Sequence, residues 1–240
     1  MMIEIKGTYG EAKVFTDMLE ESARGQISAL CEQKFVKDSK IRIMPDVHAG
    51  KGCTIGTTMT IGDCVVPNLV GVDIGCGMLT VALKEKRINL PELDSFIRKN
   101  IPAGRELRER THRSHGRIDI EELRCYKHID TRRAKESLGT LGGGNHFIEV
   151  DKDDEGNLYL VIHTGSRNLG LRVADYYQAK AYKAVGGKSQ SEVPYELAYL
   201  TGEEKADYLH DMELMQRFAT LNRDIIKEVI LDGMKFHEVD

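Results

Sequence analysis

With 240 residues, the chain is long enough for one large domain or two small ones, and hydrophobic and charged fractions of 41% and 30% indicate a globular protein. Its net charge of −4 provides no overall basic field, so only a local patch could attract nucleic acid. No apolar run reaches the roughly 18 residues of a membrane span, and the N-terminus lacks a signal-peptide pattern.

The five cysteines are odd in number, scattered along the chain and without a CxxC motif. This pattern argues against a disulfide framework and for a reducing compartment, most simply the cytoplasm.

The first forty residues predict a small helical unit. Apolar residues near helical spacing predict helices over 11–21 and 25–33, with Gly25 as the break between them. Residues 41–44 read as a short strand that ends at Pro45.

The segment after Pro45 is predicted to be a loop that carries Asp46, His48 and Lys51. Loops that hold such side chains together between strands are frequent sites of function. The alternative is an Asp–His pair that braces a turn, next to a solvated lysine.

Residues 71–77, GVDIGCG, set Asp73 and Cys76 among three glycines, between an apolar run at 65–72 and a strand-like run at 78–83. Small residues let the backbone turn tightly, and a carboxylate beside a thiolate suits a divalent metal. The alternative is a strand–turn–strand corner with an ordinary buried cysteine.

A helix is predicted to follow a polar turn within 87–100, with Pro91 in its first turn. The next segment, 103–117, is the most basic part of the chain and holds five arginines and two histidines. Arginine binds phosphate with paired donors, so this segment suits a phosphate backbone, although most charge runs are solvated loops.

The second glycine-rich centre is 138–150, where Gly142, Gly143 and Gly144 lead into Asn145 and His146 at the start of a strand. It is not a Walker loop, because no lysine follows and a strand comes next. Exposed backbone N–H groups in such a run can still hold phosphate.

A buried-type strand over 158–162 ends at His163, and a helix is predicted from about 169 to 185. Because a hairpin joins their strands, His146 and His163 are expected to lie near each other. One carboxylate, one thiolate and two imidazoles would then gather at glycine-rich strand ends, which favours a metal site.

The last part of the chain reads as one long amphipathic helix over 202–233. A new strand is expected to begin within 235–240.

Considered together, these stretches resemble the RtcB family of RNA-splicing ligases. The matching motifs are MPDVHAGKG at 44–52, GVDIGCG at 71–77, LGTLGGGNHFIE at 138–149, HTGSR at 163–167 and the helical segment FATLNRD at 218–224. The resemblance implies an α+β fold of RtcB type, with mixed sheets, glycine-rich strand-end loops and flanking helices. It also implies a single domain over 1–240 that is incomplete at its C-terminus.

The activity implied by the resemblance is a GTP- and Mn²⁺-dependent RNA ligase. Such enzymes join a 2′,3′-cyclic phosphate or 3′-phosphate RNA end to a 5′-hydroxyl end through a GMP-histidine and an activated RNA 3′ end. The RNA would be tRNA exon halves or broken RNA, and an archease-type activator is a candidate partner. The alternatives are a metal-dependent phosphohydrolase and a non-catalytic RNA- or nucleotide-binding module.

The resemblance also assigns residues, group by group. Asp73, Cys76 and His146 would hold one Mn²⁺, and Cys76 would bridge to a second held by His163 and a further histidine. The GMP site would be lined by Asn145, His146, Phe147, Ile148 and Glu149. Candidate RNA contacts are His48, Lys51, Arg105, Arg108, Arg110, Arg113 and Arg167.

The sequence departs from the family pattern at its end. In the family, the remaining histidine ligand and the histidine that accepts GMP lie beyond the equivalent of residue 240, and His237 matches neither. We therefore expect the chain to be a fragment that contains no GMP-accepting histidine and is inactive alone. A smaller departure is Asn168, where the family often has glycine.

Overall fold

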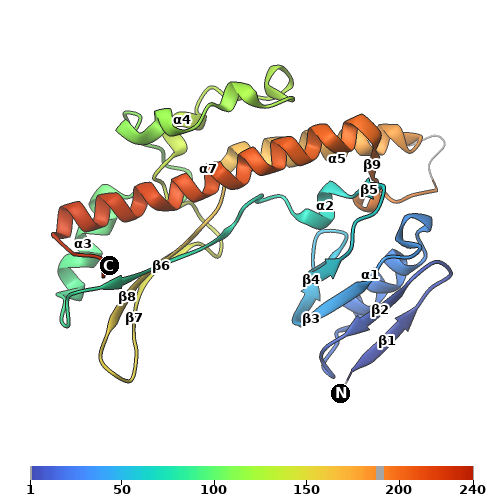
Figure 1. Ribbon diagram of the computed structural model, residues 1–240, viewed down its shortest axis with the longest axis horizontal. Helices are drawn as coiled ribbons and strands as arrows, with labels where there is room; N and C mark the ends of the chain where they lie inside the picture. The colour runs from blue at the N-terminus through green and yellow to red at the C-terminus, as the bar shows by residue number, and fades with distance from the viewer. Residues whose placement is uncertain (1, 188–191, 240) are drawn as a thin grey trace. The chain divides into compact units, whose positions relative to one another are not determined.

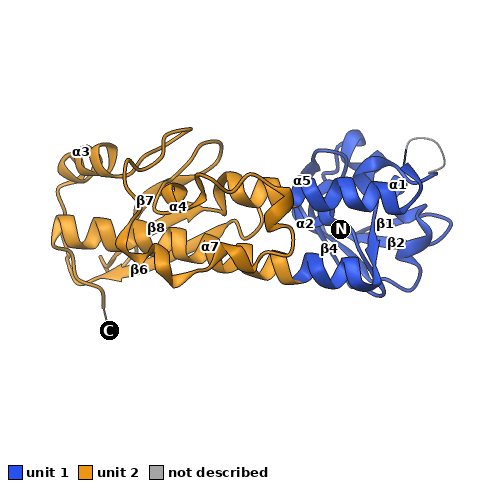
Figure 2. Ribbon diagram, turned by 90° about the horizontal axis from the view of Figure 1, so that it is seen from above, with its two compact units in different colours: residues 1–72, 174–209 blue, residues 73–173, 210–240 orange. Residues whose placement is uncertain are grey.

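The computed structural model describes residues 2–187 and 192–239 and has a mixed α+β architecture with several small sheets and flanking helices (Figure 1). The chain divides into two compact units, residues 1–72 with 174–209 and residues 73–173 with 210–240 (Figure 2). Two long helices, α5 (Arg167–Ala184) and α7 (Gly202–Met234), contribute residues to both units. No helix in the described ranges is long and apolar enough to cross a membrane.

The first unit contains a four-stranded sheet of order β1-β2-β3-β4. Its strands are β1 (Ile3–Lys6), β2 (Glu11–Val14), β3 (Ile41–Ala49) and β4 (Thr54–Met59). Strands β2 and β3 run parallel, and the other neighbours are antiparallel. Helix α1 (Glu21–Cys31) buries Ile27 and Leu30 in the same apolar cluster as Ile41 and Ile43 of the sheet.

Shorter elements complete this unit. They are η1 (Lys34–Val36), α2 (Pro67–Val70), η5 (Tyr195–Leu197) and a two-stranded pairing of β5 (Cys64–Val65) with β9 (Leu200–Thr201).

Three predictions for this unit are wrong. Gly25 does not separate two helices, because α1 runs through it from Glu21 to Cys31; one glycine costs a helix only about 1 kcal/mol, and the buried apolar face of α1 offsets this. Residues 11–14 form strand β2 instead of a helix, because Ala12 and Val14 alternate into the core while Phe15 and Met18 are exposed. Strand β3 continues through Pro45 to Ala49 instead of ending there. Its pairing with β4 shifts register between Ile43 and His48, and this irregularity accommodates a proline that cannot donate a ladder hydrogen bond.

The second unit contains a three-stranded antiparallel sheet of order β6-β8-β7. Its strands are β6 (Gly77–Leu83), β7 (Phe147–Lys152) and β8 (Leu158–Thr164). Leu160 and Ile162 of the central strand share an apolar cluster with Ile226 and Ile230 of α7. These strands and both long helices confirm the sequence predictions within a few residues.

Further short helices belong to this unit. Helix α3 (Leu90–Asn100) begins after Asn89, whose side chain accepts the Glu92 backbone N–H. The basic segment contains η2 (Arg113–Arg117), and η3 (Ile120–Glu122), η4 (Tyr126–His128) and α4 (Ala134–Ser137) follow it. Near the end of the described chain, Glu238 forms a single bridge pair with Leu83 on the free edge of β6.

Candidate metal centre

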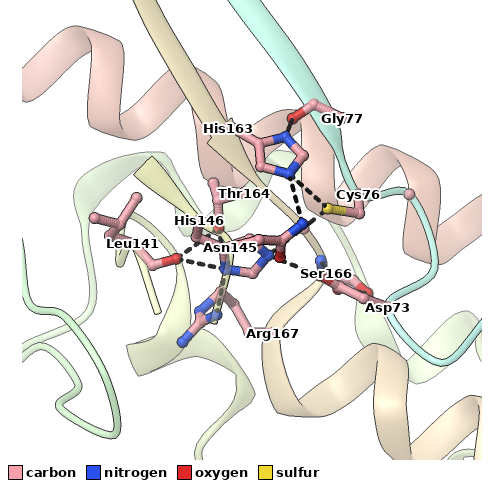
Figure 3. A network of polar contacts seen from close by, with 12 residues as sticks. Asp73, Cys76, Gly77, Leu141, Asn145, His146, His163, Thr164, Ser166 and Arg167 are labelled. Atoms are coloured by element: carbon pink, nitrogen blue, oxygen red, sulfur yellow. Dashed lines mark hydrogen bonds and ion pairs between the residues drawn. The ribbon is translucent and has the colours of Figure 1, made fainter. Parts of the chain in front are cut away.

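Strand pairing within the second unit brings the two predicted histidines together. His163 lies opposite Met78 of β6 and Phe147 of β7, because β8 is the central strand. The residues just before β6 and β7 are Cys76 and His146, so all three side chains meet at one end of the sheet (Figure 3). The hairpin argument from the sequence is confirmed in this respect, since the two imidazole centroids are 5.6 Å apart.

The polar atoms of four side chains converge at this sheet end. Cys76 Sγ lies 3.7 Å from His146 Nε2 and 3.6 Å from His163 Nε2. Asp73 Oδ2 lies 2.9 Å from His146 Nε2. One potential ligand atom each from Asp73, Cys76 and His146 falls within a mutual distance of 4.8 Å, a spacing that one metal ion could bridge.

Backbone carbonyls fix both imidazole rings from behind. Nδ1 of His146 donates to the Leu141 carbonyl at 3.0 Å, and Nδ1 of His163 donates to the Gly77 carbonyl at 3.2 Å. In both rings Nε2 is therefore the nitrogen that faces Cys76 and could bind a metal. This is the arrangement by which proteins orient metal-binding histidines.

A backbone N–H group holds the Asp73 carboxylate. Its Oδ1 accepts the Ser166 backbone N–H at 3.0 Å, at the start of helix α5, while Oδ2 faces His146. The positive end of the helix dipole favours a negative charge at this position.

The Cys76 thiol is accessible but lies in an unfavourable environment for a free thiolate. Partial removal of the sulfur from water, and then the charge of the adjacent Asp73 carboxylate, raise the pKa of this thiol to about 11. A bound cation would reverse this effect, because its own charge deprotonates a coordinating thiol. The donor set of one carboxylate, one thiol and two oriented imidazoles therefore fits a transition-metal ion.

Helix α7 contributes two site residues whose role the sequence reasoning missed, Asn222 and Arg223. Asn222 is fully buried, and Arg223 is 9% exposed. The Arg223 guanidinium donates to the carbonyls of Gly75 and Thr164 at 2.9 and 2.7 Å. The available signal was a polar Asn-Arg pair among residues that otherwise follow the apolar stripe of a long helix.

The residues expected at a GMP site occupy the start of β7. Asn145 Nδ2 lies 3.5 Å from His163 Nε2, and the Phe147 ring centroid is 5.2 Å from that of His163. Glu149 is exposed on the same strand. Ile148 is partly buried and packs against the apolar cluster on the other face of the strand.

Two of the candidate RNA-contacting arginines are engaged within the protein. Arg108 donates to the carbonyls of Leu138 and Gly139 at 3.1 and 2.9 Å, so its donors brace the turn before the glycine-rich loop. Arg167 has a positive φ of 59° and donates to Thr140 Oγ1 at 3.1 Å. A Cβ at Gly142 would lie 1.8 Å from the Arg167 guanidinium, which explains the glycine there.

The other candidate RNA-contacting residues are exposed to solvent. Arg105 and Arg110 are exposed, and Arg113 forms an exposed ion pair with Asp232 at 3.5 Å. His48 and Lys51 belong to the first unit, where both are exposed and His48 Nδ1 lies 2.9 Å from the backbone oxygen of Asp46.

Fold and site together define a mixed α+β protein with a candidate carboxylate–thiolate–imidazole metal centre at the end of a small antiparallel sheet. Comparison with known proteins adds the family. The family model described as tRNA-splicing ligase RtcB matches residues 26–123 and 106–238.

Individual relatives agree with this match. The chain is 34% identical to the RNA-splicing ligase RtcB of Escherichia coli K12 over 90% of its own length and 58% of that protein. It is 30% identical to the tRNA-splicing ligase RtcB of Nanoarchaeum equitans over 77% of its own length and 50% of that protein. The chain therefore belongs to the RtcB family and spans about half the length of these relatives.

Proposed function

We propose that this chain is the N-terminal portion of a GTP- and Mn²⁺-dependent RNA ligase. The enzyme would join RNA ends bearing a 2′,3′-cyclic phosphate or 3′-phosphate to 5′-hydroxyl ends through a GMP-histidine and an activated RNA 3′ end. The observation that carries the proposal is the convergence of Asp73, Cys76, His146 and His163 at one sheet end in a member of a family named for RNA ligation.

In this proposal, Asp73, Cys76 and His146 hold one Mn²⁺, and Cys76 with His163 forms part of a second site. The metals would supply Lewis-acid stabilisation of the phosphate charge that develops during in-line transfer. The chain's own contribution is orientation. The Leu141 and Gly77 carbonyls keep both Nε2 atoms directed at Cys76, and the Ser166 N–H restrains the Asp73 carboxylate.

We further propose that GMP binds beside this centre, along the start of β7. Asn145 would offer an amide, Phe147 a ring face and Glu149 a carboxylate, while Ile148 would contribute its backbone and the exposed part of its side chain. His146 would link the two sites, because its ring belongs to the metal centre and its backbone to the GMP segment.

The test is incubation with α-labelled GTP and Mn²⁺. A chain that also carries the family's C-terminal part should acquire label that is acid-labile and resistant to hydroxylamine, as a phosphohistidine-type bond is. The 240-residue chain alone should acquire none. Release of phosphate or nucleotide without labelling of the longer chain would favour the phosphohydrolase, and an adduct on the 240-residue chain would contradict the fragment assignment.

The basic segment provides a separate prediction about RNA. Replacing Arg105, Arg110 and Arg113 with alanine should flatten the dependence of RNA affinity on salt by about one counterion per lost phosphate contact. The measurement is log Kd against log salt concentration for a single-stranded RNA. Arg108→Ala is the matched comparison. The Arg108 guanidinium already donates to the carbonyls of Leu138 and Gly139, so its loss should lower the free energy of unfolding more than it changes the salt dependence of RNA affinity. An unchanged slope in the triple variant would make the segment a solvated loop.

The archease-type activator is a proposed partner as well. Adding such an activator to the labelling reaction should raise the yield of guanylylated longer chain if the family resemblance extends to this partner.

A further inference from the structure

Two adjacent side chains on α7, Asn222 and Arg223, lie beneath the candidate metal centre and make polar contacts with three separate segments. These segments are 73–76, 139–146 and 163–166, which we call the ligand loops because they carry Asp73, Cys76, His146 and His163.

Asn222 joins two of the ligand loops. Its Oδ1 accepts the backbone N–H groups of Gly139 and Thr140 at 2.7 and 3.2 Å. Its Nδ2 donates to the Thr140 carbonyl at 3.1 Å and to the Gly165 carbonyl at 3.2 Å. One fully buried amide therefore binds the segment leading to His146 and the segment following His163.

Arg223 joins the first of the ligand loops, 73–76, to the third, 163–166. One guanidinium nitrogen, Nη1, donates both to the Gly75 carbonyl, between Asp73 and Cys76, and to the Thr164 carbonyl, next to His163. A Cβ at Gly77 would lie 3.6 Å from the same nitrogen, so the turn after Cys76 rests directly on the guanidinium. Planar guanidinium donors hold two carbonyls in fixed geometry better than a flexible ammonium does.

The buried charge of Arg223 is not explained by a contribution to folding stability alone. Within the described ranges, no carboxylate lies within ion-pair distance of this guanidinium, although it is almost fully buried. Burying a cation without a direct counter-ion is unfavourable, and apolar replacements of buried polar groups are often tolerated or stabilising. The acidic groups nearest in effect to this cation are Cys76, Asp224 and Asp73, and two of the three belong to the candidate metal centre.

We propose that Asn222 and Arg223 are positioning residues. They would hold the three ligand loops at fixed positions relative to one another, so that the metal centre is assembled before the metal binds. The inference rests on the proposed function, because it takes Asp73, Cys76, His146 and His163 as the ligands. Neither side chain needs to touch the metal or the substrate.

The test uses Co²⁺ as the probe metal, since a thiolate–Co²⁺ charge-transfer band reports ligation by Cys76. Asn222→Leu and Arg223→Met should each weaken Co²⁺ affinity about 10- to 100-fold, the usual effect of losing groups that orient metal ligands. Arg223→Lys should recover part of the loss, because it keeps the charge and one donor. The matched control is Arg217→Met, which removes an exposed arginine from the same helix.

Hydrogen exchange of the metal-free protein gives an independent readout. Asn222→Leu should accelerate exchange at the Gly139 and Thr140 amides, whereas Arg217→Met should not. If folded variants bind Co²⁺ with unchanged affinity and band intensity, the positioning role is wrong. If Arg223→Met does not fold, Arg223→Lys decides, and unchanged affinity in that variant overturns the role of Arg223.

The two proposals fail in different ways. Absence of a Co²⁺–thiolate band in the unchanged chain contradicts the metal centre itself. A normal band in the unchanged chain that persists undiminished in all Asn222 and Arg223 variants contradicts only the positioning role.

Discussion

Replacing Cys76 with alanine is expected to abolish metal binding at both candidate sites. The sulfur lies 3.7 Å from His146 Nε2 and 3.6 Å from His163 Nε2, so it is close to both imidazoles. Alanine leaves an imidazole and a carboxylate on one side and a single imidazole on the other, too few donors for tight binding at either site. The measurement is Mn²⁺ stoichiometry by equilibrium dialysis with metal analysis.

The matched control is Cys64→Ala, which removes a partly buried thiol from the first unit. This variant should keep the Mn²⁺ stoichiometry of the unchanged chain, because Cys64 belongs to the β5 pairing and not to the metal centre. Unchanged stoichiometry in Cys76→Ala would exclude the cysteine as a shared ligand.

Gly165→Ala is expected to have the second largest effect on the site. A Cβ at this position would lie 2.2 Å from Asp73 Oδ1, far inside van der Waals contact. The carboxylate must then leave the Ser166 N–H and turn away from His146, or the backbone after β8 must move. We expect a loss of about 1–3 kcal/mol in the free energy of unfolding, as for other overpacked sites, together with a loss of metal affinity of at least about tenfold.

Gly143→Ala serves as its control in the neighbouring glycine-rich loop. Its added Cβ would meet only the Gly104 Cα at 3.7 Å, an ordinary contact. Thermal unfolding and Mn²⁺ titration of both variants check the prediction. Equal metal affinity in Gly165→Ala and the unchanged chain would mean that the position of Asp73 does not matter to the site.

Periodicity predicted the fold well where elements are long. The apolar stripe from Tyr208 to Val229 spans many turns, so it predicted the long helix correctly, and the apolar run 158–162 predicted the central strand of the second unit. Four-residue strands carry too little pattern for this. Phe15 and Met18 suggested a helix near residue 14, yet they are 44% and 83% exposed, and burial of Ala12 and Val14 by neighbouring strands decided the outcome.

The division of the chain into two units could not be predicted from the sequence. Residues 174–209 belong with the first unit although the intervening hundred residues form the second, and this pairing depends on tertiary contacts of two long helices that sequence spacing does not encode. The single incomplete domain expected from the resemblance stays a prediction.

The sequence indicated the candidate ligands of the site but not the groups that orient them. Glycine-rich strand ends with Asp73, Cys76, His146 and His163 were visible as chemistry placed on turns. The groups that orient these side chains could not be predicted, because they act through tertiary hydrogen bonds. They are the backbone carbonyls of Leu141 and Gly77 and the buried side chains of Asn222 and Arg223. For the same reason, Arg108 looked like a phosphate ligand in the sequence, while its partners are carbonyls 30 and 31 residues away.

Anomalous diffraction at the manganese edge, from crystals soaked in Mn²⁺, tests the central claim most directly. We expect the strongest anomalous peak to lie within coordination distance of Asp73, Cys76 and His146. Manganese bound elsewhere in the crystal, with no peak beside Cys76, would contradict it.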